Sequence, residues 1–222
     1  MIIMPKLKLD AALRKEYDAV ADILYTKGLV VDANPFVVKS AGANMFDVTW
    51  SGKNSTSNIL FDEEKTGIEL LEPIRSERQY TFLTYDKSII QAEYKIENDN
   101  VVKGRLLFLK LQNKVWSHDE ISEYADDPNK LDDMLNEELG LPIMIRIDFD
   151  PQNHVDCHHP KAHCVFSNVK DCRIPMKSVL SLGQFVDFIF RQFYHVELPE
   201  FDMVKFDETI TQAESKMIHI NW

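Results

Sequence analysis

The sequence predicts an α+β fold, with an N-terminal helix, a mostly antiparallel β-sheet and a C-terminal core helix packed on the sheet. Three observations carry this prediction. An amphipathic segment opens the chain, evenly spaced hairpin-like segments fill its middle, and an almost entirely apolar helical segment begins at Ser181. We expect residues 1–222 to form a single domain, with residues 195–222 as a C-terminal extension.

The first helix is predicted to run from Asp10, as its N-cap, to about Lys27, with Gly28 ending it. Apolar residues recur at helical spacing on one face, which we expect to be buried. They are Leu9, Leu13, Tyr17, Val20 and Leu24.

Strands are predicted through the middle of the chain. Residues 45–50 and 57–62 flank the turn-rich sequence SGKNST, which indicates a hairpin. Residues 79–86 and 88–96 indicate a second hairpin, and residues 104–112 add another strand. Hairpins at such even spacing are typical of an antiparallel sheet.

Residues 117–140 are acidic and predict helix with a break near Pro128. Residues 143–150 (IMIRIDFD) then alternate strictly between apolar and polar, which predicts a strand. Asp148 and Asp150 share its polar face at the strand end, roughly 6.5 Å apart.

Residues 162–168 predict the next strand, and Ser181 with Gln184 forms the capping box of the last helix. Its aromatic residues recur at helical spacing and predict a core helix instead of a cofactor site. They include Phe185, Phe188 and Phe193.

Composition is that of a folded globular protein, with 45% hydrophobic and 27% charged residues. The net charge of −11 argues against a protein that coats DNA or RNA by non-specific binding, because such binding depends on contacts of cationic side chains with phosphates. A local basic groove is still allowed, because cationic residues gather near the middle of the second half. They are Lys161, Lys170, Arg173 and Lys177.

The N-terminal segment lacks a long apolar run and a cleavage signature, so we expect no signal peptide. No segment approaches the ~20 apolar residues needed to span a membrane. The three cysteines are an odd number and do not form a disulfide framework. We therefore expect a cytoplasmic protein that does not associate with membranes.

Residues 143–177 concentrate the side chains that carry chemistry. This window holds four of the seven histidines, all three cysteines and four aspartates. Ordinary cores rarely gather so many metal-binding and proton-transferring groups, so any active or binding site is expected there.

The first hypothesis for this window is a metal site. Imidazole and carboxylate ligands together suit Zn, Mn or Fe. Asp156, His158 and Cys164 could supply further metal ligands. The structural alternative is a proline-rich loop whose histidines form hydrogen bonds with backbone groups. We expect a divalent metal such as Zn or Mn on Asp148, Asp150, His159 and His163.

The second hypothesis is metal-free acid–base chemistry on a phosphodiester. His159 and His163 would exchange protons near neutral pH, and Arg173 would hold the phosphate. Asp148 would orient an imidazole. The structural alternative is an ion pair of Arg173 with Asp148 or Asp171.

Two weaker hypotheses concern other side chains. A cysteine nucleophile would need Cys157, Cys164 or Cys172 beside a histidine, and a buried hydrophobic role explains Cys164 better. A nuclease-like D…E-x-K arrangement is formed by Asp86, Glu93 and Lys95, but a plain solvent-facing strand is favoured over it.

The order of several motifs resembles the bacterial family known as domain of unknown function 2290. The matching stretch spans about residues 81–194, and H-P-x-x-H followed by C-R-I-P is its most specific part. The residues that match are Gln91 and Tyr94; Arg105 and Leu106; Arg146, Asp148, Asp150 and Pro151; His159, Pro160 and His163; residues 172–175; and residues 185–194.

The resemblance implies a bacterial cytosolic protein from mobile or phage-defence gene neighbourhoods, without a settled activity. Two functions are expected from different classes. One is a component of a defence or toxin–antitoxin locus whose Asp/His/Arg cluster acts on a phosphodiester of nucleic acid. The other is a non-catalytic subunit of a multi-component system, which docks on an ATPase or nuclease through acidic residues 119–133 and 197–208.

Overall fold

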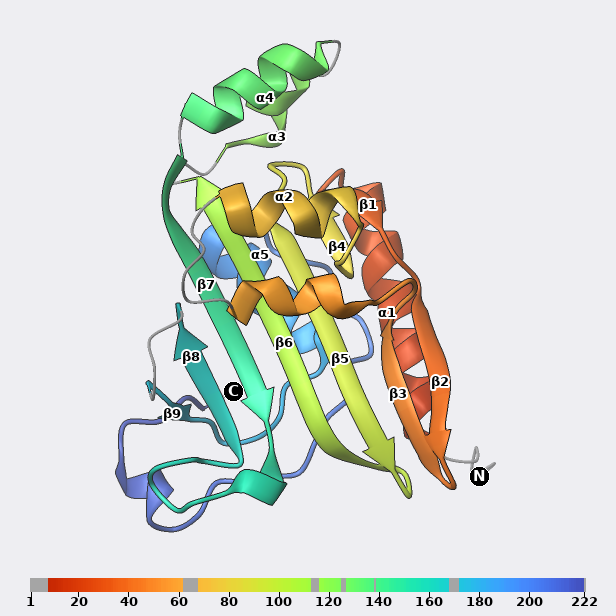
Figure 1. Ribbon diagram of the computed structural model, residues 1–222, viewed down its shortest axis with the longest axis vertical. Coiled ribbons are helices and arrows are strands. Elements are labelled where there is room, and N and C mark those ends of the chain that lie inside the picture. Colours follow the sequence, from red (N-terminus) through yellow and green to blue (C-terminus); the bar gives the residue numbers. More distant parts are fainter. Residues whose placement is uncertain are drawn as a thin grey trace.

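The computed structural model describes the chain in six ranges: residues 8–61, 68–112, 116–124, 127–137, 139–167 and 172–221. Within these ranges the strands form one nine-stranded sheet with the order β1-β4-β5-β6-β7-β8-β9, and β2-β3 joins it along β5 (Figure 1). Every strand pairing is antiparallel. The predicted α+β class is confirmed.

The strands are β1 (Val30–Ala33), β2 (Phe36–Gly42), β3 (Met45–Trp50), β4 (Phe82–Thr84), β5 (Ile89–Glu97), β6 (Asn100–Gln112), β7 (Leu139–Phe149), β8 (Ala162–Phe166) and β9 (Ile174–Pro175). The α-helices are α1 (Leu9–Thr26), α2 (Ile68–Ser76), α3 (His118–Ser122), α4 (Pro128–Glu137) and α5 (Leu182–Phe193). Short 3-10 helices are η1 (Ser55–Phe61), η2 (Pro151–Asn153) and η3 (Glu214–Lys216). None of the helices in the described ranges combines the length and apolar composition that crossing a membrane requires.

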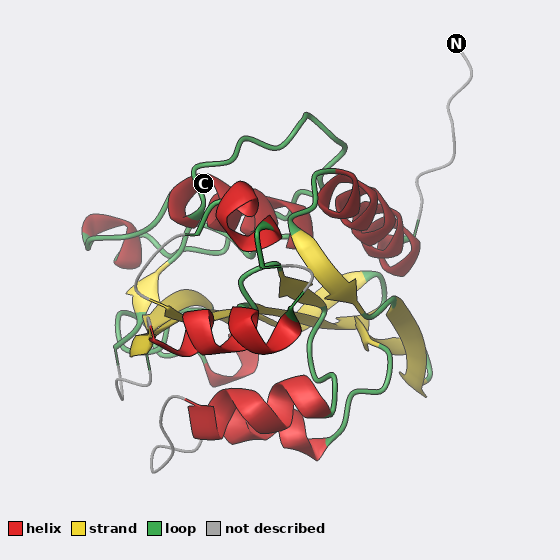
Figure 2. Cartoon of the chain, turned by 90° about the horizontal axis from the view of Figure 1, so that it is seen from above, coloured by secondary structure: helices red, strands yellow, loops and turns green. Residues whose placement is uncertain are grey.

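The sheet forms a middle layer with helices on both sides (Figure 2). On one side α1 packs against β1, β2 and β3, and α5 packs against α1 and β6, with Leu13, Phe108 and Phe185 fully buried there. The ring of Phe108 packs 5.2 Å from that of Phe193. The prediction of a C-terminal core helix is confirmed.

On the opposite side α2 covers only part of the sheet. Its Leu71 and Ile74 pack against Leu107 and Leu109 of β6. Because side chains on a strand alternate, the same face of β6 continues with Arg105 and Lys103. This face is therefore apolar beneath α2 and polar toward the other end of the strands, where the candidate site lies.

The hairpin predicted for residues 45–50 and 57–62 is wrong in its second half. Both edges of β3 are occupied, by β2 and by β5. Residues 55–61 form η1, which starts where Asn54 Oδ1 accepts a hydrogen bond from the Thr56 N–H at 2.8 Å. Asparagine side chains that bind nearby backbone in this way favour turns over strands. Asp62 lies outside the described residues.

The predicted N-cap of α1 is also wrong. The helix follows Lys8, and the N–H of Leu9 donates to Asp99 Oδ1 at 2.6 Å. Asp99 belongs to the β5–β6 turn, so a tertiary contact replaces the local cap expected from Asp10. The predicted end is confirmed, because the helix stops at Thr26 and is followed by Gly28, whose φ of 65° lies in the left-handed region.

Most of the other predicted elements are confirmed. β4 and β5 form the second hairpin, and the acidic segment divides into α3 and α4, with Pro128 starting α4. Ser181 and Gln184 form the capping box of α5. Asn168, the expected end of β8, lies outside the described residues.

Residues 195–221 form an arm that packs back on the chain. Met176 pairs with Ile220 and Ser178 with Glu208, each through a β-bridge. The arm also brings η3 next to the loop that follows β7, since His154 contacts Glu214. The C-terminal extension is thus part of the folded unit.

Candidate functional site

Four polar side chains form a row across four neighbouring strands. The register places Glu93 of β5 opposite Arg105 of β6, Arg105 opposite Asp148 of β7, and Asp148 opposite His163 of β8. Directly opposed residues of antiparallel strands project to the same face. We call these four residues the charged row.

Ion pairs connect the members of the charged row. Arg105 Nε lies 2.9 Å from Asp148 Oδ1, and Arg146 Nε lies 2.7 Å from Asp148 Oδ2. Arg105 Nη1 also lies 3.8 Å from Glu93 Oε1, and Lys53 forms an ion pair with Glu93. Each oxygen of Asp148 is therefore bonded to a different guanidinium.

Burial disfavours ionisation of Asp148, whose side chain is 13% exposed. The guanidinium groups of Arg105 and Arg146 outweigh burial and hold the pKa of this carboxyl below its usual value. Asp148 therefore stays ionised at neutral pH and fixes both arginines in place.

A pocket of about 150 Å³ lies beside Asp148, and we call it the polar pocket. It is lined by Lys103, Gly104, Arg105, Arg146, Asp148, Phe149, Asp150, His159, His163 and Arg173. All five residues that the sequence analysis selected as site residues are among them. The end of β7, the turn at Pro160 and the segment before β9 thus meet at one concave site.

His163 is positioned from both of its ring nitrogens. Its Nδ1 lies 2.8 Å from the carbonyl oxygen of Pro160, and its Nε2 lies 3.9 Å from Asp148 Oδ2. Because a carbonyl can only accept, Nδ1 carries the proton and Nε2 of the neutral ring keeps its lone pair. Burial lowers the pKa of His163, and the Pro160 carbonyl and Asp148 only partly oppose this effect. The neutral ring is thus favoured near pH 7.

His159 stands edge-to-face against His163, with ring centroids 4.9 Å apart. Its Nδ1 is buried and has no hydrogen-bond partner among the described residues. Buried polar atoms normally find a partner, so this nitrogen has unused hydrogen-bonding capacity.

The residues predicted as metal ligands do not form a compact set. In the described part of the chain, no three of their ligand atoms lie within 4.8 Å of one another. The two guanidinium groups on Asp148 would also compete with a metal cation for its oxygens. A metal bound by Asp148, Asp150, His159 and His163 stays a prediction.

Of the two partners expected for Arg173, one is bonded to other arginines and the other is not described. Asp148 is bonded to Arg105 and Arg146, and Asp171 lies outside the described residues. Arg173 contributes its side chain to the lining of the polar pocket.

Two of the three cysteines do not support nucleophilic chemistry. Cys164 is buried in the core side of β8, and burial raises the pKa of its thiol to about 12. Burial and the nearby Asp156 also raise the pKa of Cys157. Since the thiolate is the reactive form, neither residue is prepared for attack.

The D…E-x-K hypothesis is not supported by the structure. Asp86 is fully buried and pairs with Lys110, which lies on the α5 side of β6 beside Phe108. Glu93 belongs to the charged row on the opposite side. A carboxylate pair divided by the sheet cannot hold a common metal ion.

A larger pocket of about 500 Å³ adjoins the polar pocket. The two share Lys103, Gly104 and Arg105 in their linings. The larger pocket lies where residues 53–58, which include the start of η1, face β3, β5 and β6, and Lys39, Lys53 and Lys95 are among its lining residues. Cationic side chains therefore continue from one pocket into the next.

The structural roles of Arg105 and Arg146 were not predicted from the sequence. Arg146 shares a strand face with Asp148 by the period-two rule, so their contact had a local signal. The register of β6 against β7, which brings Arg105 to Asp148, has no such signal.

A family model matches residues 29–222, and its description is Uncharacterized conserved protein (DUF2290). The chain belongs to this family. The resemblance noted from the motifs is thereby confirmed, and the DUF2290 match extends past both ends of the stretch that carries them. No curated protein and no solved structure matches the chain.

The pKa shift of His163 predicts how the stability of this DUF2290 protein depends on pH. Its folded-state pKa lies below the ordinary value of about 6.5, so the unfolded chain takes up this proton first as pH falls. The free energy of unfolding should therefore drop below about pH 6.5. Asparagine can still donate to the Pro160 carbonyl but does not titrate, so His163→Asn should flatten this drop in urea titrations at pH 7.5 and 5.5. Equal pH dependence in both proteins would contradict the assignment.

Proposed function

We propose that the polar pocket binds a phosphate group of a nucleic acid and cleaves the phosphodiester by acid–base catalysis. The observation that carries the proposal is the convergence of two histidines with several cationic side chains on one concave surface. Four cationic side chains and two carboxylates line the pocket, so its formal charge is +2 with neutral histidines, in a chain of net charge −11.

His163 is suited to act as the general base. Its protonated Nδ1 is fixed on Pro160, and its lowered pKa keeps Nε2 available to remove a proton from an attacking hydroxyl or water. His159, in ring contact with it, would deliver a proton to the leaving oxygen. Arg173 would hold the phosphate oxygens.

Asp148 would act through its neighbours. By bonding one guanidinium with each oxygen, it fixes Arg105 and Arg146 along the pocket wall, where they would stabilise developing negative charge. The adjoining 500 Å³ pocket, with its four lysines, would accommodate the nucleotides that flank the reacting phosphate.

Cleavage assays with single- and double-stranded DNA and RNA test this proposal. We expect His163→Asn and His159→Ala each to lower the cleavage rate by about 10²–10⁴-fold with little change in melting temperature. The control is His158→Ala, which changes an exposed histidine of the same loop outside the pocket lining. Absence of cleavage by the wild-type chain, or equal rates in the histidine variants, would contradict the proposal.

A second candidate function has an observation of its own. Asp148 is saturated by two arginines and His163 is 2% exposed, which also suits a network that fixes loop shape. In that case the chain is a non-catalytic subunit of a bacterial, cytoplasmic defence or toxin–antitoxin system. It would dock on an ATPase or nuclease through acidic residues of α3 and α4. His163→Asn would then lower the melting temperature, and charge reversal at exposed Asp119 and Glu123 would abolish capture of the partner.

A further inference from the structure

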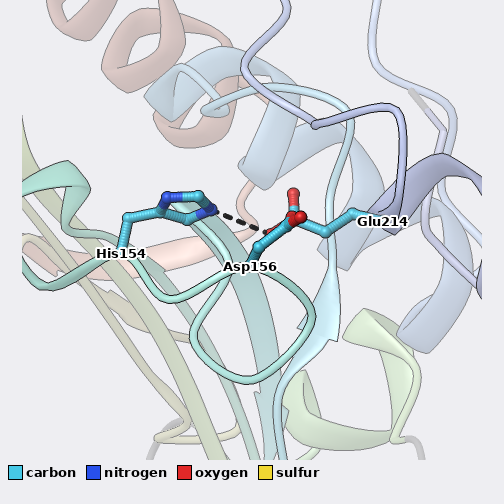
Figure 3. Close-up of side chains that lie close together, drawn as sticks. All are labelled: His154, Asp156 and Glu214. Carbon is cyan, nitrogen blue, oxygen red and sulfur yellow. Dashed lines mark hydrogen bonds and ion pairs between the residues drawn. The ribbon is translucent and has the colours of Figure 1, made fainter.

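A second cluster of metal-binding side chains lies outside the polar pocket. It consists of His154 and Asp156, from the loop after β7, and Glu214 of η3 (Figure 3). One ligand atom from each residue lies within 4.8 Å of the others. We infer that these three residues form a binding site for a divalent transition metal, with Zn²⁺ as the preferred ion.

The loop places two ligands on one side through its backbone conformation. His154 is extended, with φ −61° and ψ 129°, and Val155 forms a β-bridge with His159. Residues two apart in extended chain project in the same direction, which brings His154 and Asp156 together. Cys157 then turns the chain with a φ of 64°.

The C-terminal arm fixes the third ligand. Thr211 and Glu214 bond reciprocally: the Thr211 N–H donates to Glu214 Oε2 at 3.0 Å, and the Glu214 N–H donates to Thr211 Oγ1 at 3.2 Å. The Thr211 hydroxyl also donates to Asp156 Oδ1 at 2.5 Å. Thr211 thus orients each carboxylate through one oxygen. The other oxygen of Glu214, Oε1, lies 3.1 Å from His154 Nε2, where both atoms can bind one ion.

The charge of the cluster also calls for a cation. The Glu214 side chain is 1% exposed, and its ion-pair partner among the described residues is His154, with Nε2 and Oε1 3.1 Å apart. No lysine or arginine of the described residues pairs with Glu214 or Asp156. A buried carboxylate beside a second one is unfavourable unless a positive charge lies between them, and histidine is not a permanent cation at neutral pH.

The donor set indicates the kind of ion. One imidazole nitrogen and two carboxylate oxygens suit Zn²⁺ or Mn²⁺, whereas Ca²⁺ and Mg²⁺ favour oxygen alone. For a given set of nitrogen and oxygen ligands, divalent affinity rises from Mn²⁺ to Zn²⁺. Three protein ligands leave at least one position for water.

The site would join two segments that are distant in sequence. The loop between Asp150 and His159, both in the polar-pocket lining, would be tied by the ion to the C-terminal arm. The inference does not depend on the proposed phosphodiester activity, because it rests on different side chains.

Calorimetric titration of the full chain with ZnCl₂ and MnCl₂ tests the inference. We expect saturable binding of one Zn²⁺ per chain, weaker binding of Mn²⁺, and a rise in melting temperature with Zn²⁺. Asp156→Asn, at an exposed position, should weaken Zn²⁺ binding at least about tenfold and remove the thermal shift.

Two controls separate this site from other zinc-binding positions. His158→Ala removes an exposed imidazole of the same loop and should leave the Zn²⁺ affinity unchanged. His163→Asn removes an imidazole of the polar pocket and should also leave it unchanged. Absence of 1:1 binding, equal affinity in Asp156→Asn, or loss of binding in His163→Asn would overturn the inference.

Discussion

Replacing Asp86 with asparagine is expected to lower the free energy of unfolding by about 3–5 kcal/mol, because it leaves Lys110 charged and buried. Asp86 is 0% and Lys110 is 1% exposed, and the two form an ion pair on the face of the sheet that α5 covers. The Thr84 hydroxyl and the Tyr194 hydroxyl donate to Asp86 Oδ1 at 2.6 and 3.0 Å. Burial opposes ionisation, but Lys110, and hydrogen bonds from Thr84 and Ser88, hold the pKa of Asp86 below its ordinary value.

Urea denaturation of Asp86→Asn and of Asp86→Asn combined with Lys110→Met checks this result. The double variant has no uncompensated charge, so it should recover a large part of the lost stability. The wild-type pair contributes stability above the ordinary carboxyl pKa, and this contribution is lost as pH falls through the lower folded-state pKa. A single-variant loss under about 1 kcal/mol would show that the pair is not buried as described.

The second large effect is expected from Gly183→Ala in the first turn of α5. A Cβ at this position would lie 2.7 Å from Phe201 Cε2 and 2.8 Å from Glu16 Oε1. Glu16 cannot move without loss, because its Oε1 accepts from the Ser181 hydroxyl at 2.6 Å and from the Val204 N–H at 2.9 Å. We expect a loss of about 1–3 kcal/mol in the free energy of unfolding.

Gly104→Ala is the matched control for this substitution. A Cβ on Gly104 would meet Tyr94 Cδ1 at 3.4 Å, an ordinary van der Waals contact. Its effect on the urea midpoint should be small, so that the difference between the two variants measures crowding at Glu16 and Phe201. Similar midpoints for both would contradict the close packing of α1, α5 and the C-terminal arm.

Elements with strong local patterns were predictable from the sequence. Strict alternation identified β7, and Ser181 with Gln184 identified the start of α5, because both signals depend on neighbouring residues. The segment that became η1 is apolar enough for a strand. Its conformation was decided by Asn54 and by the occupied edges of β3, which local apolar character does not report.

The candidate site was predictable in part for the same reason. Asp148, His159, His163 and Arg173 belong to one window of the sequence, and the polar pocket contains all of them. The pairing of Arg105 with Asp148 depends on strand register, and Glu214 reaches His154 from 60 residues away. Such long-range contacts leave no pattern in neighbouring residues.

The charged row and the apolar core depend on the same alternation of side chains between the two faces of each strand. Glu93, Arg105, Asp148 and His163 alternate with core residues such as Ile147 and Cys164. Deleting one residue within β7 would shift the parity of the remainder, turning carboxylate and guanidinium toward α5 and isoleucines toward water. Single-residue insertions and deletions in β5–β8 should therefore be far rarer among functional variants than substitutions, and length changes should be confined to the turns.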